Sequence, residues 1–324
     1  MEAALIVDEP SSWLGAKQMA KQNKGTVGVV GLGNMGGAFA RHLAAAGWRV
    51  LGFDIDAARK RAAKRAGVEI APDVATLAAA APVMILSLPS PQALDATVAA
   101  ISRDKLPARI VVEAGTFKLD DKQRAERALR KAGHVMLDCP VSGTGAQAAV
   151  KDIVIYASGD AKAIAKTTRM FSDFSRAAYN VGEFGNGSRM KYVANLLVTI
   201  HNVASAEAMV LGIKSGLDPQ MVYDLIRAGV GTSRVFEVRA PMMVQNRYDH
   251  ASMSIKLYHK DISVIEDHAA KLGVPTPLFS ASIPVYSAAL SMGYGEQDTA
   301  SVCGVLQTMA GVRRGKPVKR FKRR

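Results

Sequence analysis

Two different hydrophobic patterns divide the chain. Between residues 25 and 184, short apolar runs alternate with longer segments in which apolar residues recur at helical spacing. Short apolar strands that alternate with helices are typical of a parallel sheet covered on both faces. We therefore predict an α/β unit here, with strands at residues 27–30, 49–53, 83–86, 110–112, 134–138 and 153–156.

The strand pattern ends before residue 185, and a helical pattern follows. Residues 188–215 contain no proline, which predicts one long helix that ends at Gly216. Shorter segments downstream show the same helical texture, so the second half of the chain should be entirely helical. These predicted helices span residues 219–228, 233–246, 260–272, 279–292 and 299–310.

Charge is distributed unevenly along the 324 residues. There are 42 lysines and arginines against 28 acidic residues, a formal net charge of +14. Eight of the basic residues fall within 313–324, which leaves a mildly basic body of +6 (14 − 8). We expect a basic, disordered tail at 312–324 and a loose N-terminal extension at 1–24.

Cysteine content and hydropathy exclude two classes of protein. Two cysteines cannot form a disulfide framework, and their scarcity suits a reducing, cytoplasmic location. The sequence has no run of 18 or more consecutive apolar residues, so we expect no membrane span and no membrane partner. The six histidines show no metal-ligand spacing, so we expect no metal site.

A glycine-rich turn follows the first predicted strand and opens the first helix. In this context the pattern G-x-G-x-x-G indicates a dinucleotide site, with the pyrophosphate at the helix N-terminus. Asp54 ends the second predicted strand, where a carboxylate can bind a ribose, which favours NAD. Arg59, Lys60 and Arg61 follow closely and could contact a phosphate, which keeps NADP possible. The residues of the turn are Gly31, Leu32, Gly33, Asn34, Met35 and Gly36.

These observations define the fold class that we predict. Residues 25–184 should form an NAD(P)-binding Rossmann domain, doubly wound on a mostly parallel sheet. Residues 185–311 should form an all-helical domain, entered through the long interdomain helix.

Four motifs, in this order, resemble the β-hydroxyacid dehydrogenase family, which includes 3-hydroxyisobutyrate dehydrogenase. The resemblance covers about residues 26–311. The motifs are the glycine turn at 31–36, the segment Asp138-Cys139-Pro140-Val141-Ser142-Gly143-Thr144, the segment from Gly185 to Asn195 that contains Lys191, and the pair Lys260-Asp261.

The resemblance implies specific roles. Lys191 would be the general acid/base, and Asn195, which lies on the same helical face, would hold the substrate oxygen in register with it. Ser142, Gly143 and Thr144 would bind the substrate carboxylate. Leu88, Pro89, Thr116 and Lys260 would contact the cofactor. Without the resemblance, Arg189 would be as good a candidate as Lys191, and residues 142–144 would be an ordinary strand-ending turn.

Several positions depart from the family pattern and put the substrate in doubt. Thr144 and Gly115 replace a usual glycine and a usual serine, and Gln147 and Lys151 stand where glycine is frequent. Ala194 argues against 6-phosphogluconate dehydrogenases, which carry histidine there, and Lys191 argues against imine reductases.

The function that we predict is NAD-dependent hydride transfer involving a short β-hydroxyacid or its semialdehyde. The resemblance implies a homodimer or homotetramer. Two alternatives remain: a reductase of bulkier carbonyl or imine compounds, and a polyanion-binding or nucleic-acid-binding scaffold that uses the basic tail. Beyond weak contact through that tail, we expect no nucleic-acid partner.

Overall fold

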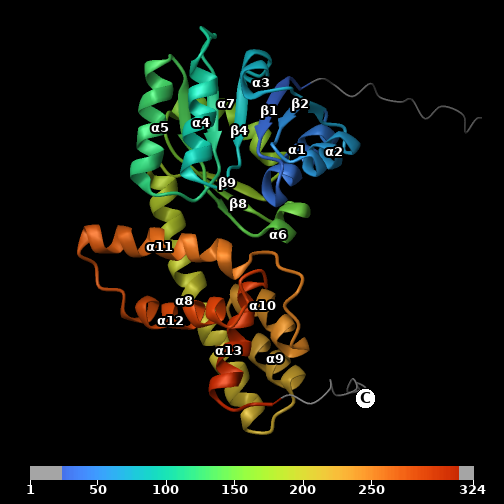
Figure 1. Cartoon of the computed structure of the whole chain (residues 1–324), viewed down its shortest axis with the longest axis vertical. Coiled ribbons are helices and arrows are strands. Elements are labelled where there is room, and N and C mark those ends of the chain that lie inside the picture. The colour runs from blue at the N-terminus through green and yellow to red at the C-terminus, as the bar shows by residue number, and fades with distance from the viewer. Residues whose placement is uncertain (1–23, 314–324) are drawn as a thin grey trace, which may run out of the picture.

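The chain folds into two domains joined by one long helix. A computed structural model describes residues 24–313; all but the last residue of the predicted extension and most of the predicted tail lie outside the described residues. Figure 1 shows the α/β domain above the helical domain, with helix α8 (Asn186–Lys214) running from one into the other. The predicted two-domain organisation therefore describes the architecture.

A six-stranded parallel sheet forms the centre of the first domain. Its strand order, β3-β2-β1-β4-β5-β6, is that of a Rossmann domain. Strands β1 to β3 are added toward one edge of the sheet, and β4 to β6 toward the other. In this fold, ligands bind in the crevice at the carboxyl ends of the two strands where the order changes, β1 and β4. The strands are β1 (Thr26–Val30), β2 (Arg49–Phe53), β3 (Glu69–Ile70), β4 (Val83–Leu86), β5 (Ile110–Glu113) and β6 (Val135–Asp138).

Helices cover both faces of this sheet, as the continuous apolar strands predict. Each face has its own apolar core; on one of them Phe39 packs against Phe174 with ring centroids 4.7 Å apart. One face carries α1 (Asn34–Ala45), α2 (Ala57–Arg65) and α7 (Ala161–Ser172), and the other carries α3 (Val74–Ala80), α4 (Pro91–Ser102) and α5 (Leu119–Lys131).

The predicted strand at 153–156 does not join the main sheet. It corresponds to β8 (Val154–Ala157), which belongs to a separate three-stranded sheet and runs antiparallel to β7 (Val141–Ser142) and parallel to β9 (Ala177–Asn180). Only the short helix α6 (Gly145–Ala149) and its flanking turns connect β7 to β8. A parallel pairing needs a longer crossover, so this connection produces an antiparallel pair.

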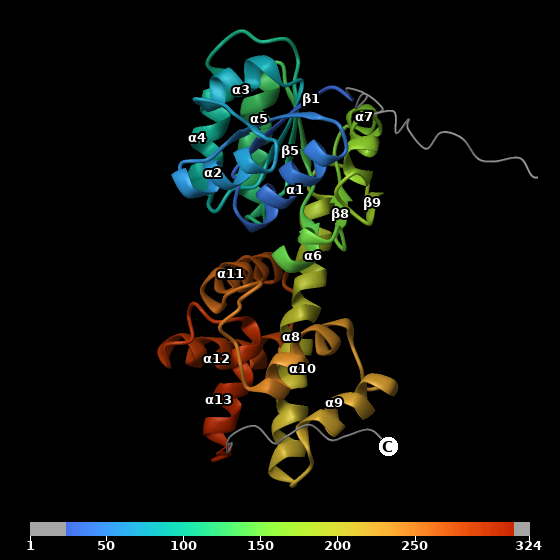
Figure 2. The ribbon, with the colours of Figure 1, turned by 90° about the vertical axis from the view of Figure 1, so that its right-hand side faces the viewer.

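The helical domain is built around α8. Thirteen of its residues are buried, and its apolar core includes residues from all the helices that follow. Figure 2 shows α8 upright, with α11, α12 and α13 on one side and α9 on the other. The helices are α9 (Pro219–Ala228), α10 (Arg234–Gln245), α11 (Ile255–Leu272), α12 (Pro277–Ser291), the 3-10 turn η1 (Thr299–Ser301) and α13 (Val302–Met309).

One predicted boundary in this domain is wrong. Helix α11 begins five residues before the predicted start at Lys260, because Ser254 caps it by accepting a hydrogen bond from Leu257 N at 3.4 Å. Lys260 therefore lies in the second turn of the helix and not at its first residue. This shift places the side chains of both Leu257 and Lys260 on the cavity described below.

Candidate functional site

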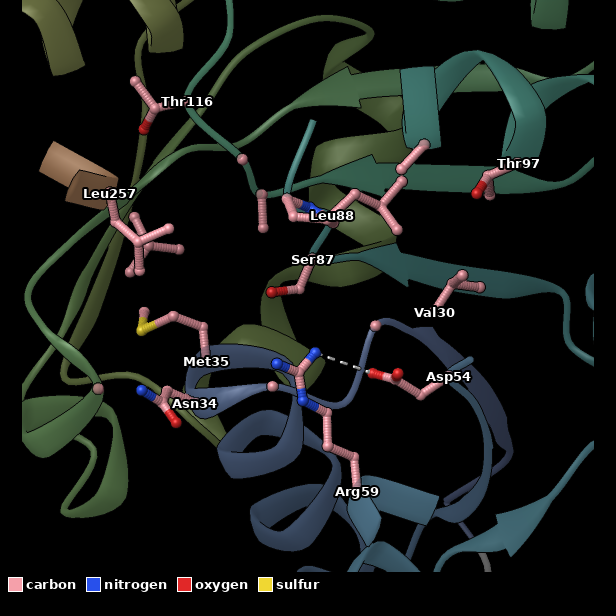
Figure 3. A pocket seen from close by; sticks show the side chains of 18 of the residues that line it. Val30, Asn34, Met35, Asp54, Arg59, Ser87, Leu88, Thr97, Thr116 and Leu257 are labelled. Carbon is pink, nitrogen blue, oxygen red and sulfur yellow. Dashed lines mark ion pairs between the residues drawn. The ribbon is translucent and has the colours of Figure 1, made fainter. Parts of the chain in front are cut away.

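A cavity of about 550 Å³ lies between the two domains, at the carboxyl ends of β1 and β4. The Rossmann domain contributes the glycine turn and the loops after β2, β4 and β5. The helical domain contributes Lys191 from α8, Ser252 and Met253 from the loop before α11, and residues of α11 itself. Figure 3 shows Leu257 lying across the cavity from Ser87 and Leu88. The cavity is therefore made jointly by both domains.

The three glycines of the turn have separate structural roles. Gly31 has a φ of +89°, and a Cβ there would overlap the carbonyl oxygen of Ser87. A Cβ on Gly36 would overlap the carbonyl oxygen of Gly31, so helix and strand pack at backbone contact. At Gly33 the nearest atom to an added Cβ is Nη1 of Arg59, at 3.7 Å. Gly33 thus faces open cavity, and a bound pyrophosphate could approach its backbone.

Asp54 is buried and braces the glycine turn. Its carboxylate accepts hydrogen bonds from Leu32 N at 2.7 Å and from Asp56 N at 2.8 Å. Nη1 of Arg59 lies 3.6 Å from the same carboxylate, an ion pair drawn in Figure 3. The guanidinium is half exposed and borders the cavity, so Asp54 and Arg59 line the same end of it.

The predicted cofactor contacts after β4 and β5 also line the cavity. Leu88 and Pro89 follow β4, and Thr116 follows β5. Lys260 reaches across from α11, where its Nζ donates a hydrogen bond to the carbonyl oxygen of Thr116 at 2.7 Å and lies 4.9 Å from the ring centroid of Phe117. Lys260 therefore ties the helical domain to this loop.

Lys191 is buried where the long helix meets the cavity. Its side chain is 8% exposed, and it makes no hydrogen bond or ion pair within residues 24–313. Burial lowers its pKa to about 8; the charge of Asp261 opposes that shift, whereas the charges of Lys260 and Lys122 add to it. An amine with such a pKa can both accept and donate a proton near neutral pH.

Asn195 lies one turn after Lys191 and is turned toward Asp261. Its Nδ2 donates a hydrogen bond to Oδ2 of Asp261 at 3.0 Å, while Nζ of Lys260 lies 3.5 Å from the other carboxylate oxygen. Burial raises the pKa of Asp261, and the charges of Lys260 and Lys191 oppose the increase. Asp261 borders the cavity, whereas Asn195 does not. Asn195 thus orients the carboxylate beside the lysine.

The predicted carboxylate-binding turn contributes only in part. Gly143 borders the cavity at a φ of +135°, and a Cβ there would lie 2.7 Å from the side chain of Ile153. Ser142 is half-buried at the end of β7, and neither it nor Thr144 lines the cavity. Thr144 instead caps α6 in a capping box with Gln147, whose Oε1 accepts a hydrogen bond from Thr144 N at 3.1 Å.

Three departures from the family pattern, Thr144, Gln147 and Gly115, have local structural explanations, whereas Lys151 has none. Thr144 and Gln147 form the capping box, which needs side chains that glycine lacks. A Cβ on Gly115 would lie 2.6 Å from Oε1 of Glu113, so a serine could not replace this glycine without a shift. Lys151 has a φ of +62°, a conformation in which glycine is favoured. Nothing in the structure explains Ala194.

Sequence reasoning left several cavity residues out of the predicted site. Asp261 belongs to the fourth motif and Arg59 follows Asp54 closely, so their positions in the sequence could have marked them as site residues. The others are apolar or small residues without a motif, brought in by tertiary folding. These include Ser87, Thr97, Gly145, Met253 and Leu257. Within residues 24–313, no three His, Cys, Asp or Glu side chains are grouped so as to hold a metal ion.

Comparison with known families matches both domains. Residues 26–182 match the family described as the NAD-binding domain of 6-phosphogluconate dehydrogenase. Residues 185–306 match the family described as NAD-binding of NADP-dependent 3-hydroxyisobutyrate dehydrogenase. The two matches meet where the chain passes from the Rossmann domain into the long helix.

Individual relatives are similar along most of their length. The L-threonate dehydrogenase of Cupriavidus necator is 31% identical over 283 residues, which cover 85% of this chain and 94% of the relative. The NAD-dependent L-serine dehydrogenase of Pseudomonas aeruginosa is 28% identical, with 84% and 94% covered. The crystal structure of 3-hydroxyisobutyrate dehydrogenase from Salmonella typhimurium has a TM-score of 0.79 and 27% identity, and the match covers 86% of this chain and 99% of that chain. The chain belongs to the β-hydroxyacid dehydrogenase family, and it is an NAD(P)-dependent oxidoreductase of hydroxyacids.

Proposed function

We propose that the protein interconverts a short β-hydroxyacid and its semialdehyde, with Lys191 as the general acid/base. The observation that carries this proposal is the buried amine of Lys191, which lines the cavity between the two domains and is not engaged by any described side chain. Bound NAD(P) accepts the hydride in oxidation and supplies it in reduction. The chain itself must bind both molecules and move one proton.

The proton step follows from the lowered pKa of Lys191. In oxidation the neutral amine accepts the proton of the substrate hydroxyl, and in reduction the ammonium returns a proton to the same oxygen. Asp261 stands beside the lysine and stabilises its ammonium form, while Asn195 holds that carboxylate in place. With Asp261 and Asn195 beside it, Lys191 can therefore act as the base in oxidation and as the acid in reduction.

We propose that the substrate carboxylate lies at the turn of Ser142 and Gly143. The left-handed backbone of Gly143 borders the cavity, and the Ser142 hydroxyl is half-buried beside it. Backbone amides in such a turn, together with a hydroxyl, bind anions. Thr144 contributes indirectly, because its capping box shapes the helix that follows the turn.

We propose NAD as the preferred cofactor. The buried carboxylate of Asp54 at the end of β2 favours a free ribose over one that carries a 2′-phosphate. Arg59 remains the group that could contact that phosphate, because its guanidinium borders the cavity. Parallel assays with NAD and NADP decide this preference.

A substrate panel tests the activity itself. L-threonate, L-serine and 3-hydroxyisobutyrate, the compounds in the names of the relatives, should be offered with each cofactor, together with bulkier carbonyl and imine compounds in the reverse direction. Turnover of a β-hydroxyacid supports the proposal. Turnover confined to imines or bulky carbonyls would replace it with the alternative reductase.

We propose further that the protein is a homodimer or homotetramer that associates through α8. The helix is long enough and apolar enough to cross a membrane, yet only 44% of its most apolar 18-residue segment is buried inside the protein. Its exposed large apolar residues share one face because their spacing follows helical periodicity: Met190, Val193, Leu197 and Leu211. A second copy of this chain would cover such a face, and the buried opposite face marks α8 as a core helix.

Sedimentation velocity tests the assembly. Leu197→Glu should give monomers, whereas the same change at Val230, an exposed apolar residue outside α8, should leave the oligomer intact. A wild-type monomer would contradict this proposal without affecting the proposed reaction. We also propose a cytoplasmic location, supported by two buried free cysteines and tested by fractionation.

A further inference from the structure

Three charged side chains form a buried cluster below the cavity. Glu113 and Asp138 end the adjacent strands β5 and β6 in register with each other, and Lys122 reaches them from α5. Nζ of Lys122 lies 2.6 Å from Oε2 of Glu113 and 2.7 Å from Oδ1 of Asp138, and it donates a hydrogen bond to the carbonyl oxygen of Gly115 at 2.7 Å. All three side chains are completely buried.

Such a cluster is costly unless its charges and polar atoms are paired. Burial lowers the pKa of Lys122, but the charges of Asp138 and Glu113 outweigh that effect and raise its pKa above the ordinary value. The lysine therefore stays charged, and with two carboxylates the cluster carries a net charge of −1 (+1 − 2). Without Lys122, two buried carboxylates would stand side by side with no cation between them, and they would repel each other.

Asp138 also connects this cluster to the long helix. Its carboxylate accepts hydrogen bonds from the backbone N of Ser188 at 2.7 Å and from the Ser188 hydroxyl at 2.8 Å. Ser188 is the third residue of α8, where a free backbone N–H normally needs a cap. The residue that precedes the helix is Gly185, which has no side chain to supply one. Asp138 caps α8 from the sheet.

The cap lies one turn before the proposed catalytic lysine. Ser188 and Lys191 are three residues apart, so they lie on neighbouring positions of the same helix surface. The first turn is held closely: Gly187 N donates a hydrogen bond to the Ser158 hydroxyl at 3.0 Å, and a Cβ on Gly187 would lie 2.6 Å from the carbonyl oxygen of Asp138. The height and rotation of this turn set where the Lys191 amine enters the cavity.

We propose that Lys122 is a positioning residue for the reaction: by bridging Asp138 and Glu113, it holds the Asp138 carboxylate against Ser188, fixes the first turn of α8 and thereby places Lys191 against the cofactor and substrate. This inference rests on the proposed role of Lys191. Lys122 itself does not line the cavity. It acts through Asp138 and Ser188.

The decisive comparison uses two variants of the cluster. Lys122→Met removes the bridging charge and leaves two carboxylates in competition, so the cap on Ser188 weakens. Adding Glu113→Gln removes the second carboxylate, restores the formal cluster charge of −1 and relieves the repulsion on Asp138. Lys131→Met, on the exposed last turn of the same helix, is the matched control.

Two readouts follow the position of α8. Hydrogen exchange of the peptide covering residues 186–192 reports the cap directly and needs no turnover. In Lys122→Met we expect faster exchange in that peptide and kcat lower by ~10- to 100-fold, with the cofactor Kd changed by less than ~3-fold. The double variant should recover both exchange protection and kcat, and the control should match the wild type.

Other outcomes are decisive as well. Wild-type exchange and kcat in folded Lys122→Met would overturn the inference, even if its melting temperature falls, because the cluster would then serve stability alone. If Lys122→Met does not fold, Ser188→Ala removes one donor to Asp138 more gently, and unchanged exchange and kcat in that variant would overturn the inference. If the wild type oxidises no β-hydroxyacid, the proposed function fails, while the exchange data still decide the role of Lys122.

Discussion

Replacing Lys191 by methionine should make the folded protein more stable while abolishing its activity. The ammonium of Lys191 is held in a buried site, which lowers its pKa from the ordinary 10.5 to about 8. Each pKa unit corresponds to about 1.36 kcal/mol, so the buried cation costs about 3 kcal/mol at pH 7. Methionine fills the same space without a charge.

Two details refine the expected magnitude. The charge of Lys191 lowers the pKa of Asp261, so its loss makes that buried carboxylate less favourable and offsets part of the gain. We therefore expect a net gain of roughly 1–3 kcal/mol at pH 7. The gain should shrink as pH rises. Below pH 8 the buried ammonium destabilises the folded wild type most, and above pH 10.5 the amine is neutral in both the folded and the unfolded state, so this effect disappears.

Urea unfolding of wild type and Lys191→Met at pH 7 and pH 9.5 measures this effect. The difference in the free energy of unfolding between the two proteins should fall by roughly 2 kcal/mol between these pH values. Arg189→Met, an exposed change on the same helix, should show no such pH dependence. A Lys191→Met protein that is less stable than the wild type at both pH values would refute the view that burial destabilises the ammonium.

Three further predictions follow from the site. With a saturating substrate, the oxidation rate should rise with pH through a midpoint near 8, because oxidation needs the neutral amine of Lys191. The reduction rate should fall through the same region, because reduction needs the ammonium. A flat pH profile in stopped-flow experiments would argue against this role of Lys191. Gly33→Ala should fold but bind NAD at least ~10-fold more weakly by titration calorimetry. Gly36→Ala should instead lower the melting temperature, because its Cβ overlaps the carbonyl oxygen of Gly31. A Gly33→Ala protein that mainly loses stability, or a Gly36→Ala protein that mainly loses NAD binding, would contradict these roles. Arg59→Met should raise KM for NADP several-fold more than KM for NAD, and equal changes would remove Arg59 from phosphate recognition.

Local patterns predict the fold well because each element carries its own signal. The continuous apolar strands, the glycine turn and the proline-free stretch of α8 each indicate a local structure without any knowledge of tertiary contacts. The strand at 153–156 was correctly identified, but its partner was not. Strand pairing depends on the length and geometry of the connection through α6, which the apolar pattern does not contain.

The residues of the site also fall into those that local patterns predict and those that depend on tertiary structure. Motif residues such as Gly31, Asp54 and Lys191 were predicted and line one cavity. Leu257 could not be predicted, because it enters the site only when Ser254 starts α11 earlier than the pattern suggests. The partnership of Lys122 with Asp138 is equally invisible in the sequence, since it joins a helix to the ends of two strands.

Turnover by Lys191→Met, measured beside Arg189→Met and the wild type, tests the central claim most directly. The assay follows nicotinamide absorbance with the best β-hydroxyacid of the panel, and calorimetry measures NAD binding to each protein. The account predicts that Lys191→Met loses at least ~100-fold in kcat while its Kd for NAD stays within ~3-fold, and that Arg189→Met keeps wild-type activity. A Lys191→Met enzyme with wild-type kcat would contradict it.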